Sequence, residues 1–279
     1  MTAQLETGGE RVILETWSGA LAGLRSGEPG APAVVLLPGY TGSKEDFAPV
    51  MSPLAHAGFA VTAIDLPGQF ESAGPADPAA YTPQALGVVV RDVAAAVGPR
   101  VHLVGHSFGG LVARAAVIAE PEAFLSLVLM GSGPAGIGGA RRDLIDHLEP
   151  VLAVSGMAAA YDAGLEASRA QAGYVEPPAA LAAFLRRRFV ASAPAMLQGM
   201  GDALRTELDR VAELAAVELA MLVLHGVDDD AWSPSVQSDM ARRLDVDRVV
   251  IGGAAHSPAV ENPSATAAAL IDFWRHCDH

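Results

Sequence analysis

Short apolar segments alternate with amphipathic segments along most of this chain, and this alternation constrains the fold more than any other feature. Strands are expected at residues 33–37, 59–64, 101–104, 125–130, 221–225 and 249–251. Helices are expected at residues 44–57, 84–97, 110–119, 236–244 and 265–274. Strands that alternate with helices predict a mostly parallel sheet with helices on both faces. Residues 12–17 and 20–25 flank Ser18-Gly19 and predict a hairpin in front of it.

The alternation stops between about residues 133 and 219. This segment has helical patterns divided by Pro150, Pro177-Pro178 and Pro194, but no convincing strand. The sequence therefore predicts a core domain formed by residues 1–132 and 220–279. Residues 133–219 are expected to form a helical cap inserted into it.

Composition removes several classes of function. The chain has 18 basic and 32 acidic residues, and its net charge of −14 disfavours binding to nucleic acids and to anionic membranes. Its apolar runs are far shorter than the roughly 20 residues that span a bilayer, and its polar start does not resemble a signal peptide. The single cysteine, Cys277, allows no intrachain disulfide. We expect a cytoplasmic protein.

One motif points to nucleophilic catalysis. Gly105-His106-Ser107-Phe108-Gly109 matches G-x-S-x-G and lies between an expected strand and an expected helix. In that context the serine occupies a tight turn that exposes its hydroxyl at the edge of the sheet, so Ser107 is the expected nucleophile. The backbone N–H of Phe108, at the start of the helix, would face a developing oxyanion. A second oxyanion donor is expected from the turn after residues 33–37, where the N–H of Tyr40 is the candidate.

A serine nucleophile needs a base, and the base needs a group that orients it. His256 follows the last expected strand in a loop of small residues and is the best placed of the eight histidines. Three aspartates follow the strand at 221–225, and Asp229 is the expected orienting acid, with Asp230 and then Asp228 as alternatives. The chain order Ser107, Asp229, His256 is that of the α/β-hydrolase fold.

At these residues the chain resembles the α/β-hydrolase superfamily, and in particular small bacterial serine hydrolases with a helical cap. The likeness covers nearly the whole chain and rests on Gly105–Gly109, the Gly226-x-x-Asp229 spacing, His256 and the Pro38-Gly39-Tyr40 turn. It implies an eight-stranded sheet, a Ser–His–Asp triad and no cofactor. The loop at residues 65–72 departs from the family, because it lacks the common arginine. A serine nucleophile disfavours haloalkane dehalogenase and epoxide hydrolase chemistry.

Neither a cofactor nor a metal is expected. Gly131–Gly136 fits G-x-G-x-x-G, but no second strand with a terminal acidic residue follows, so a dinucleotide site is not predicted. The histidines and acidic residues show no metal-ligand motif such as H-E-x-x-H.

The predicted activity is hydrolysis of a carboxylic ester of a small apolar substrate. An amidase, a lactonase, a carbon–carbon bond hydrolase or a cofactor-free perhydrolase would use the same triad, and a small-molecule receptor on the same fold is also compatible. Candidate residues for an apolar substrate pocket are Met157, Tyr161, Met196, Met200 and Trp232. Arg186-Arg187-Arg188 is expected to be a solvated helix face, with recognition of an acidic substrate group as the alternative. The oligomeric state is open.

Overall fold

The computed structural model describes residues 8–171 and 173–277. One eight-stranded sheet forms its centre, with the strand order β1-β2-β4-β3-β5-β6-β7-β8. The strands are β1 (Glu10–Thr16), β2 (Gly19–Ser26), β3 (Ala33–Leu37), β4 (Ala60–Ile64), β5 (Val101–His106), β6 (Phe124–Met130), β7 (Ala220–Gly226) and β8 (Asp247–Ile251). The pairs β1–β2 and β2–β4 are antiparallel, and the remaining neighbours pair in parallel. The predicted hairpin and the mostly parallel α/β sheet are confirmed.

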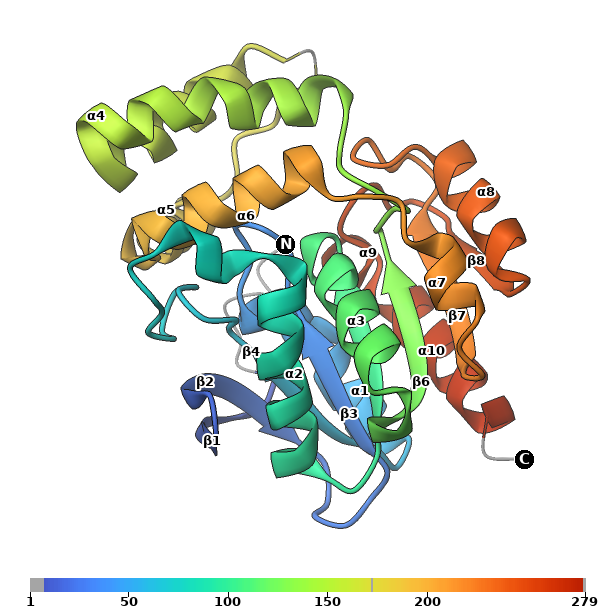
Figure 1. Ribbon diagram of the computed structural model, residues 1–279. Helices are drawn as coiled ribbons and strands as arrows, with labels where there is room; N and C mark the ends of the chain where they lie inside the picture. Colours follow the sequence, from blue (N-terminus) through green and yellow to red (C-terminus); the bar gives the residue numbers. More distant parts are fainter. Residues whose placement is uncertain (1–7, 172, 278–279) are drawn as a thin grey trace.

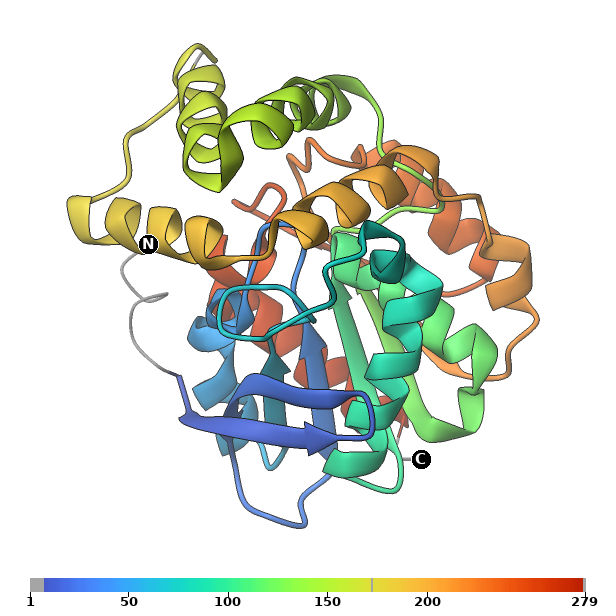
Figure 2. The same ribbon diagram turned by 60° about the vertical axis from the view of Figure 1, so that its left-hand side comes forward.

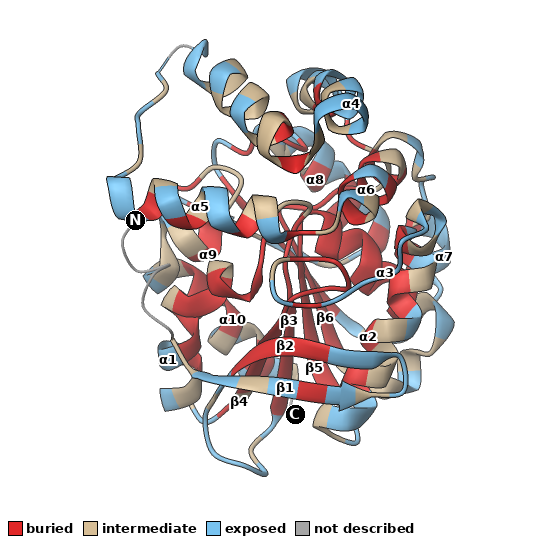
Figure 3. Ribbon diagram, turned by 90° about the vertical axis from the view of Figure 1, so that its left-hand side faces the viewer, coloured by how far each residue is buried: buried red, intermediate tan, exposed pale blue. Residues whose placement is uncertain are grey.

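The central strands are apolar along their whole length because both faces of the sheet are covered. In β3, Val34 and Leu36 point into one apolar cluster, whereas Val35 and Leu37 point into the other, and all four are fully buried. Figure 3 shows the central strands β3, β5 and β6 as buried, whereas much of β1 is exposed.

Helices pack on both faces of this sheet. The first face is covered by α2 (Pro83–Val97), α3 (Phe108–Ala119) and α8 (Pro234–Leu244). The second face is covered by α1 (Ala48–His56) and α10 (Pro263–Cys277). Figure 1 shows α2 and α3 in front of the strands and α1 and α10 behind them. Because the strands from β4 to β8 in the sheet order pair in parallel, their carboxyl ends lie at one edge of the sheet, where ligands bind in open α/β folds.

The chain between β6 and β7 forms the helices α4 (Gly139–Arg169), α5 (Ala179–Ala191), α6 (Pro194–Thr206) and α7 (Val211–Ala215). Gly156, with φ of 77°, interrupts the helical backbone of α4 and bends it. Figures 1 and 2 show α4, α5 and α6 stacked above the sheet. α7 instead packs against α3 and α8, with Val211 and Leu214 buried in the core cluster of that face. The division of the chain into core and cap at residues 133 and 219 stays a prediction.

The two ends of this insert meet at one place. The N–H of Gly136 donates to the carbonyl of Glu207 (2.9 Å), and the N–H of Ile137 donates to the carbonyl of Leu204 (2.7 Å). Arg114 of α3, which is fully buried, donates to the Glu207 carboxylate (2.7 Å) and to the carbonyl of Pro134. A side chain of α3 is thereby bonded to both the outgoing and the returning chain.

None of the helices in the described part of the chain combines the length and the apolar character needed to cross a membrane.

Candidate active site

Ser107 lies between β5 and α3 as the only residue that separates the strand from the helix. Its φ of 56° and ψ of −120° form a strained backbone conformation that residues other than glycine rarely adopt. A Cβ atom at Gly105 would collide with the carbonyl of Gly109, so the turn closes only because that position carries no side chain. The expected strand–turn–helix context is present, and the turn is tighter than the sequence indicated, since α3 begins at Phe108.

The His256 ring lies between Ser107 and Asp229 and contacts both. Its Nε2 is 2.9 Å from the Ser107 hydroxyl, and its Nδ1 is 3.0 Å from Asp229 Oδ1. An ionised carboxylate can only accept, so Nδ1 carries the proton that it donates to Asp229. Nε2 is then free to accept the proton of the serine hydroxyl. The structure thus brings together the three residues predicted from three separate loops.

Asp229 is held by two further donors. The N–H of Ala231 donates to Oδ1 (2.9 Å), and the buried amide of Gln237 donates to Oδ2 (2.9 Å). Burial alone raises the pKa of Asp229, but the hydrogen bond and charge of His256, together with these donors, outweigh it, so the pKa lies below its usual value. Asp229 is therefore charged at neutral pH and oriented at both carboxylate oxygens.

The two neighbouring aspartates have other positions. Asp230 is exposed and forms a bidentate ion pair with Arg141 of α4 (2.8 and 3.1 Å). Asp228 is also exposed, and its N–H donates to the carbonyl of Ala254. Of the three candidates named from the sequence, Asp229 contacts His256.

His106, which precedes Ser107, supports the loop of His256. Its Nε2 lies 2.8 Å from the carbonyl oxygen of His256, and the two rings lie 5.0 Å apart. Burial and the neighbouring His256 lower the pKa of His106 to about 4. His106 is therefore neutral at neutral pH and donates from Nε2 to that carbonyl.

The turn that carries Tyr40 is anchored by a buried ion-pair network. Lys44 is the only lysine of the chain and is fully buried. Its Nζ donates to Asp65 (2.8 Å) and Glu71 (2.7 Å), and its backbone N–H donates to the other oxygen of Asp65 (2.8 Å). Burial lowers the pKa of Lys44, but the carboxylates of Asp65, Glu71 and Glu45 outweigh it and raise the pKa above its usual value. These bonds fix the loop after β3 against the end of β4.

Both expected oxyanion donors belong to residues near Ser107, because Phe108 follows it in the chain and Gly39, which precedes Tyr40, passes close to it. Phe108 starts α3 with its ring fully buried in the core, and Tyr40 lines the cavity and donates its hydroxyl to the carbonyl of Leu197 (2.7 Å). Within residues 8–171 and 173–277, neither backbone N–H has a hydrogen-bond acceptor. Their role as oxyanion donors stays a prediction.

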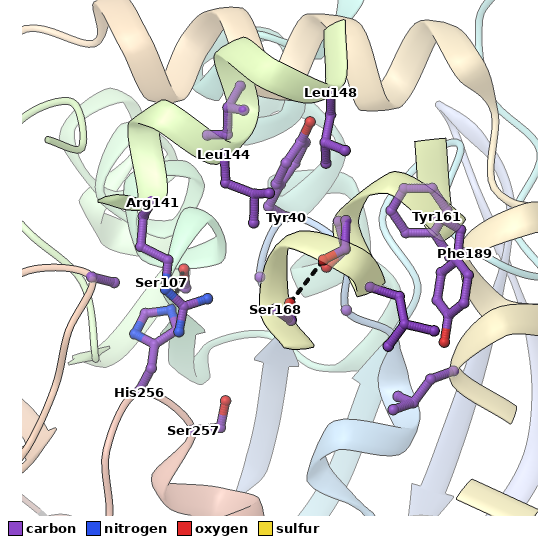
Figure 4. Close-up of a pocket in the computed structure, with 18 of the residues that line it drawn as sticks. Tyr40, Ser107, Arg141, Leu144, Leu148, Tyr161, Ser168, Phe189, His256 and Ser257 are labelled. Atoms are coloured by element: carbon purple, nitrogen blue, oxygen red, sulfur yellow. Dashed lines mark hydrogen bonds between the residues drawn. The ribbon is translucent and has the colours of Figure 1, made fainter. Parts of the chain in front are cut away.

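Ser107 and His256 lie at the floor of a cavity of about 550 Å³ (Figure 4). Its walls come from the turn after β3, from α4 and from α5. Most of the wall is apolar, and it includes Ile137, Leu144, Ile145, Leu148, Ala160, Leu165, Leu181, Leu185, Phe189 and Leu204. A cavity of this size and character fits a small apolar molecule.

Of the pocket residues named from the sequence, Tyr161 lines this cavity and packs edge-on against Phe189. Met157, Met196 and Met200 are buried but lie outside its lining. Trp232 is also outside it. The indole N–H of Trp232 donates to the carbonyl of Ala135 (3.1 Å), and its ring lies 6.4 Å from that of His256.

Two arginines line the cavity, and both are paired with aspartates. Arg141 lies above Ser107 and His256 (Figure 4) and is bonded to Asp230. Arg188 is buried and donates to Asp46 (2.6 Å). The expectation of a solvated face at residues 186–188 is therefore wrong for Arg188 and holds for Arg186 and Arg187, which are exposed. The face of α5 that carries Arg188 turns toward the cavity, where Asp46 compensates its charge.

In the described part of the chain, no group of three or more His, Cys, Asp or Glu side chains could hold a metal ion.

The sequence model that describes the alpha/beta hydrolase family matches residues 34–269 of this chain. The chain belongs to that family. A curated relative, the pimeloyl-[acyl-carrier protein] methyl ester esterase of Edwardsiella ictaluri, is 27% identical over 262 residues, which cover 86% of this chain and 92% of the relative. A solved hydrolase from Pseudomonas aeruginosa PA01 is 25% identical, with a TM-score of 0.80 over 95% of this chain and 98% of the other. The enol-lactonase from Burkholderia xenovorans LB400 is 22% identical, with a TM-score of 0.80 over 95% of this chain and 100% of the lactonase chain. This likeness shows the fold alone.

Two polar residues near the site were not found from the sequence. Gln237 holds Asp229, and Gln69 donates to the carbonyl of Gly39 (2.7 Å). Neither residue belongs to a motif, and the contact of Gln69 joins two loops that are 30 residues apart in the chain. The departure of the loop at residues 65–72 from the family pattern is the one signal that marks Gln69.

Proposed function

We propose that this alpha/beta hydrolase is a serine esterase that cleaves a carboxylic ester of a small or medium-sized apolar substrate. The observation that carries the proposal is the hydrogen-bonded chain from Ser107 through His256 to Asp229 at the floor of an apolar cavity. An isolated serine hydroxyl is a poor nucleophile at neutral pH, whereas one that donates to an oriented imidazole is activated.

In the proposed mechanism, His256 Nε2 takes the proton of Ser107 as the hydroxyl oxygen attacks the ester carbonyl. Asp229 keeps His256 in the required tautomer and stabilises the imidazolium that forms. The N–H groups of Tyr40 and Phe108 stabilise the oxyanion. His256 then protonates the leaving alcohol. In the second half of the reaction, His256 takes a proton from the water that attacks the acyl-enzyme and returns it to Ser107.

The chemistry of the cavity supports the substrate class. Both arginines in the lining are neutralised by aspartates, so an uncharged group is accommodated more readily than an anion. The curated relative from Edwardsiella ictaluri is named as a methyl ester esterase. Together these observations favour an ester with an apolar acyl group.

The first test combines labelling and turnover. We expect a fluorophosphonate to label wild type stoichiometrically, and a series of p-nitrophenyl esters from acetate to decanoate to be hydrolysed. Both should be lost in Ser107→Ala. Ser126→Ala is a matched control, because Ser126 also contacts a histidine (His102, 2.9 Å) but is fully buried within the sheet. This variant should keep its labelling.

Two outcomes would contradict the proposal. Folded wild type that neither labels nor turns over would mean that Ser107 is not activated, and a binding protein on this fold would then be the better description. Labelling that survives in Ser107→Ala would assign the nucleophile elsewhere.

A further inference from the structure

Gln69 is a fully buried residue of the loop after β4, and both ends of its side-chain amide are bonded. Its Nε2 donates to the carbonyl of Gly39 (2.7 Å), and its Oε1 accepts from the N–H of Leu66 (3.0 Å). A carbonyl can only accept and a backbone N–H can only donate, so these partners fix which end of the amide faces Gly39.

The carbonyl that Gln69 contacts belongs to the same peptide group as the N–H of Tyr40. The group is planar and its C=O and N–H point in opposite directions, so whatever fixes the Gly39 carbonyl also aims the Tyr40 N–H. The backbone of Gly39 passes close to the nucleophile, since a Cβ there would lie 3.0 Å from Ser107 Cβ and 3.4 Å from its Oγ. The N–H of Gly42 donates to the same carbonyl (3.1 Å), so both of its lone pairs are used.

We propose that Gln69 is a positioning residue for the acyl-transfer reaction, which it serves by holding the Gly39–Tyr40 peptide with its N–H directed at the oxyanion. The inference rests on the proposed function and concerns the same site. A donor that is already aimed needs no reorganisation when charge develops on the substrate oxygen, and this preorganisation is the source of its effect on rate. Gln69 therefore acts on the transition state and has little effect on ground-state binding.

A purely structural role for Gln69 predicts that its loss affects kcat no more than the loss of other hydrogen bonds in the same loop. The loop at residues 65–72 is also closed by backbone bonds, from the N–H of Gln69 to the carbonyl of Leu66 (2.9 Å) and from the N–H of Ser72 to the carbonyl of Gln69 (2.8 Å). Ser72 provides a matched control, because it is buried in the same loop and bonds to Asp65 and Ala22, away from the cavity. Ser72→Ala removes two hydrogen bonds from the loop without touching the Gly39–Tyr40 peptide.

The experiment compares wild type, Gln69→Met, Gln69→Glu and Ser72→Ala. Gln69→Met removes the donor at nearly constant volume, and Gln69→Glu keeps the acceptor for Leu66 but places a carboxylate oxygen against the Gly39 carbonyl. The readouts are kcat and KM for p-nitrophenyl butyrate and the affinities for a trifluoromethyl ketone and its methyl ketone analogue. The first ketone forms an oxyanion with the serine, whereas the second resembles the ground state. Thermal unfolding reports the loop's contribution to stability.

For Gln69→Met we expect kcat to fall roughly 10- to 100-fold, below the roughly 10²- to 10³-fold loss that removal of a whole oxyanion donor costs. KM and methyl ketone affinity should stay within about twofold, while trifluoromethyl ketone affinity falls in parallel with kcat. Gln69→Glu should lose at least as much, and Ser72→Ala should keep kcat even if its melting temperature drops.

An active wild type with a Gln69→Met variant that matches Ser72→Ala in kcat would overturn this inference and leave the esterase proposal intact. Equal losses of affinity for the two ketones would also overturn it. A wild type without labelling or turnover would overturn the proposed function, and this inference with it.

Discussion

Asp229 and Asp230 are adjacent in the chain but have opposite surroundings. Asp229 is buried and bonded to His256, Ala231 and Gln237. Asp230 points outward to Arg141. A turn that follows a strand directs consecutive side chains in different directions, so one residue of the pair reaches the site and the other reaches solvent.

This contrast predicts different effects for two isosteric substitutions. Asp229→Asn should lower kcat by roughly 10⁴-fold, the loss caused by the wrong histidine tautomer in a Ser–His–Asp site. Asp230→Asn removes one exposed ion pair, worth about 0–1 kcal/mol, and should change kcat by less than about fivefold. Ester hydrolysis by the two purified variants checks this. An Asp230→Asn variant that loses more activity than Asp229→Asn would reverse the assignment.

At the residue scale, the sequence identifies the side chains that follow strands. Ser107, Asp229 and His256 each come after an apolar run that predicts a strand, and parallel strands end at a common edge of the sheet. Gln69 and Gln237 carry no such mark. Their hydrogen bonds depend on how two loops meet in space, and a glutamine in a loop is by default a surface residue.

The buried guanidinium of Arg114 joins α3, the helix that follows Ser107, to both ends of the insert. Its charge is compensated by Glu207, whose side chain is also almost entirely buried. Removal of one partner of a buried pair leaves the other charge without compensation, which costs far more than loss of a surface pair.

We therefore expect Arg114→Met to lower the free energy of unfolding by about 3–5 kcal/mol. Combining it with Glu207→Gln, which removes the stranded charge, should recover part of that loss. Arg91→Met breaks the more exposed pair with Glu120 and should cost about 1 kcal/mol or less. Urea unfolding followed by tryptophan fluorescence measures all three. Equal losses for Arg114→Met and Arg91→Met would show that the buried pair does not stabilise the fold as argued.

At the element scale, the helices of the insert explain why Tyr161 lines the cavity while the three methionines named from the sequence do not. Met157, Met196, Met200 and Tyr161 all occupy apolar positions on helices, and their sequence patterns are alike. Each of these helices also has an apolar surface toward its neighbours, and the methionines lie there. Which apolar side faces the cavity depends on packing between α4, α5 and α6, and on the bend at Gly156. Periodicity shows that a side is apolar but not what it faces.

The stability of the whole molecule depends on pH through its buried titratable groups. His106 is neutral in the fold down to about pH 4, because burial and His256 lower its pKa. In the unfolded chain its pKa is about 6.5. Between these values the unfolded state binds a proton that the folded state does not, so the contribution of His106 to stability falls as the pH is lowered. Asp65, whose burial raises its pKa to about 6, contributes in the opposite sense.

A comparison of wild type with His106→Gln isolates the first of these effects. Relative to the variant, wild type should lose up to about 3 kcal/mol of folding free energy as the pH falls from about 6.5 to about 4. Asp229 does not contribute in this window, because its lowered pKa makes its contribution fall only below about pH 3.9. Urea unfolding at half-unit pH steps measures the difference. A difference that is independent of pH would contradict the assignment of a buried neutral His106.

The joined ends of the insert bear on how this protein could change its specificity over evolution. Because β6 and β7 are neighbours in the sheet and the N–H of Gly136 donates to the carbonyl of Glu207, the chain leaves the sheet and returns to it at one place. Doubling the length of a flexible loop costs only about 0.6 kcal/mol. A loop between the helices of this insert can therefore lengthen at little cost in stability, while the register of the sheet and the position of Ser107 remain as they are.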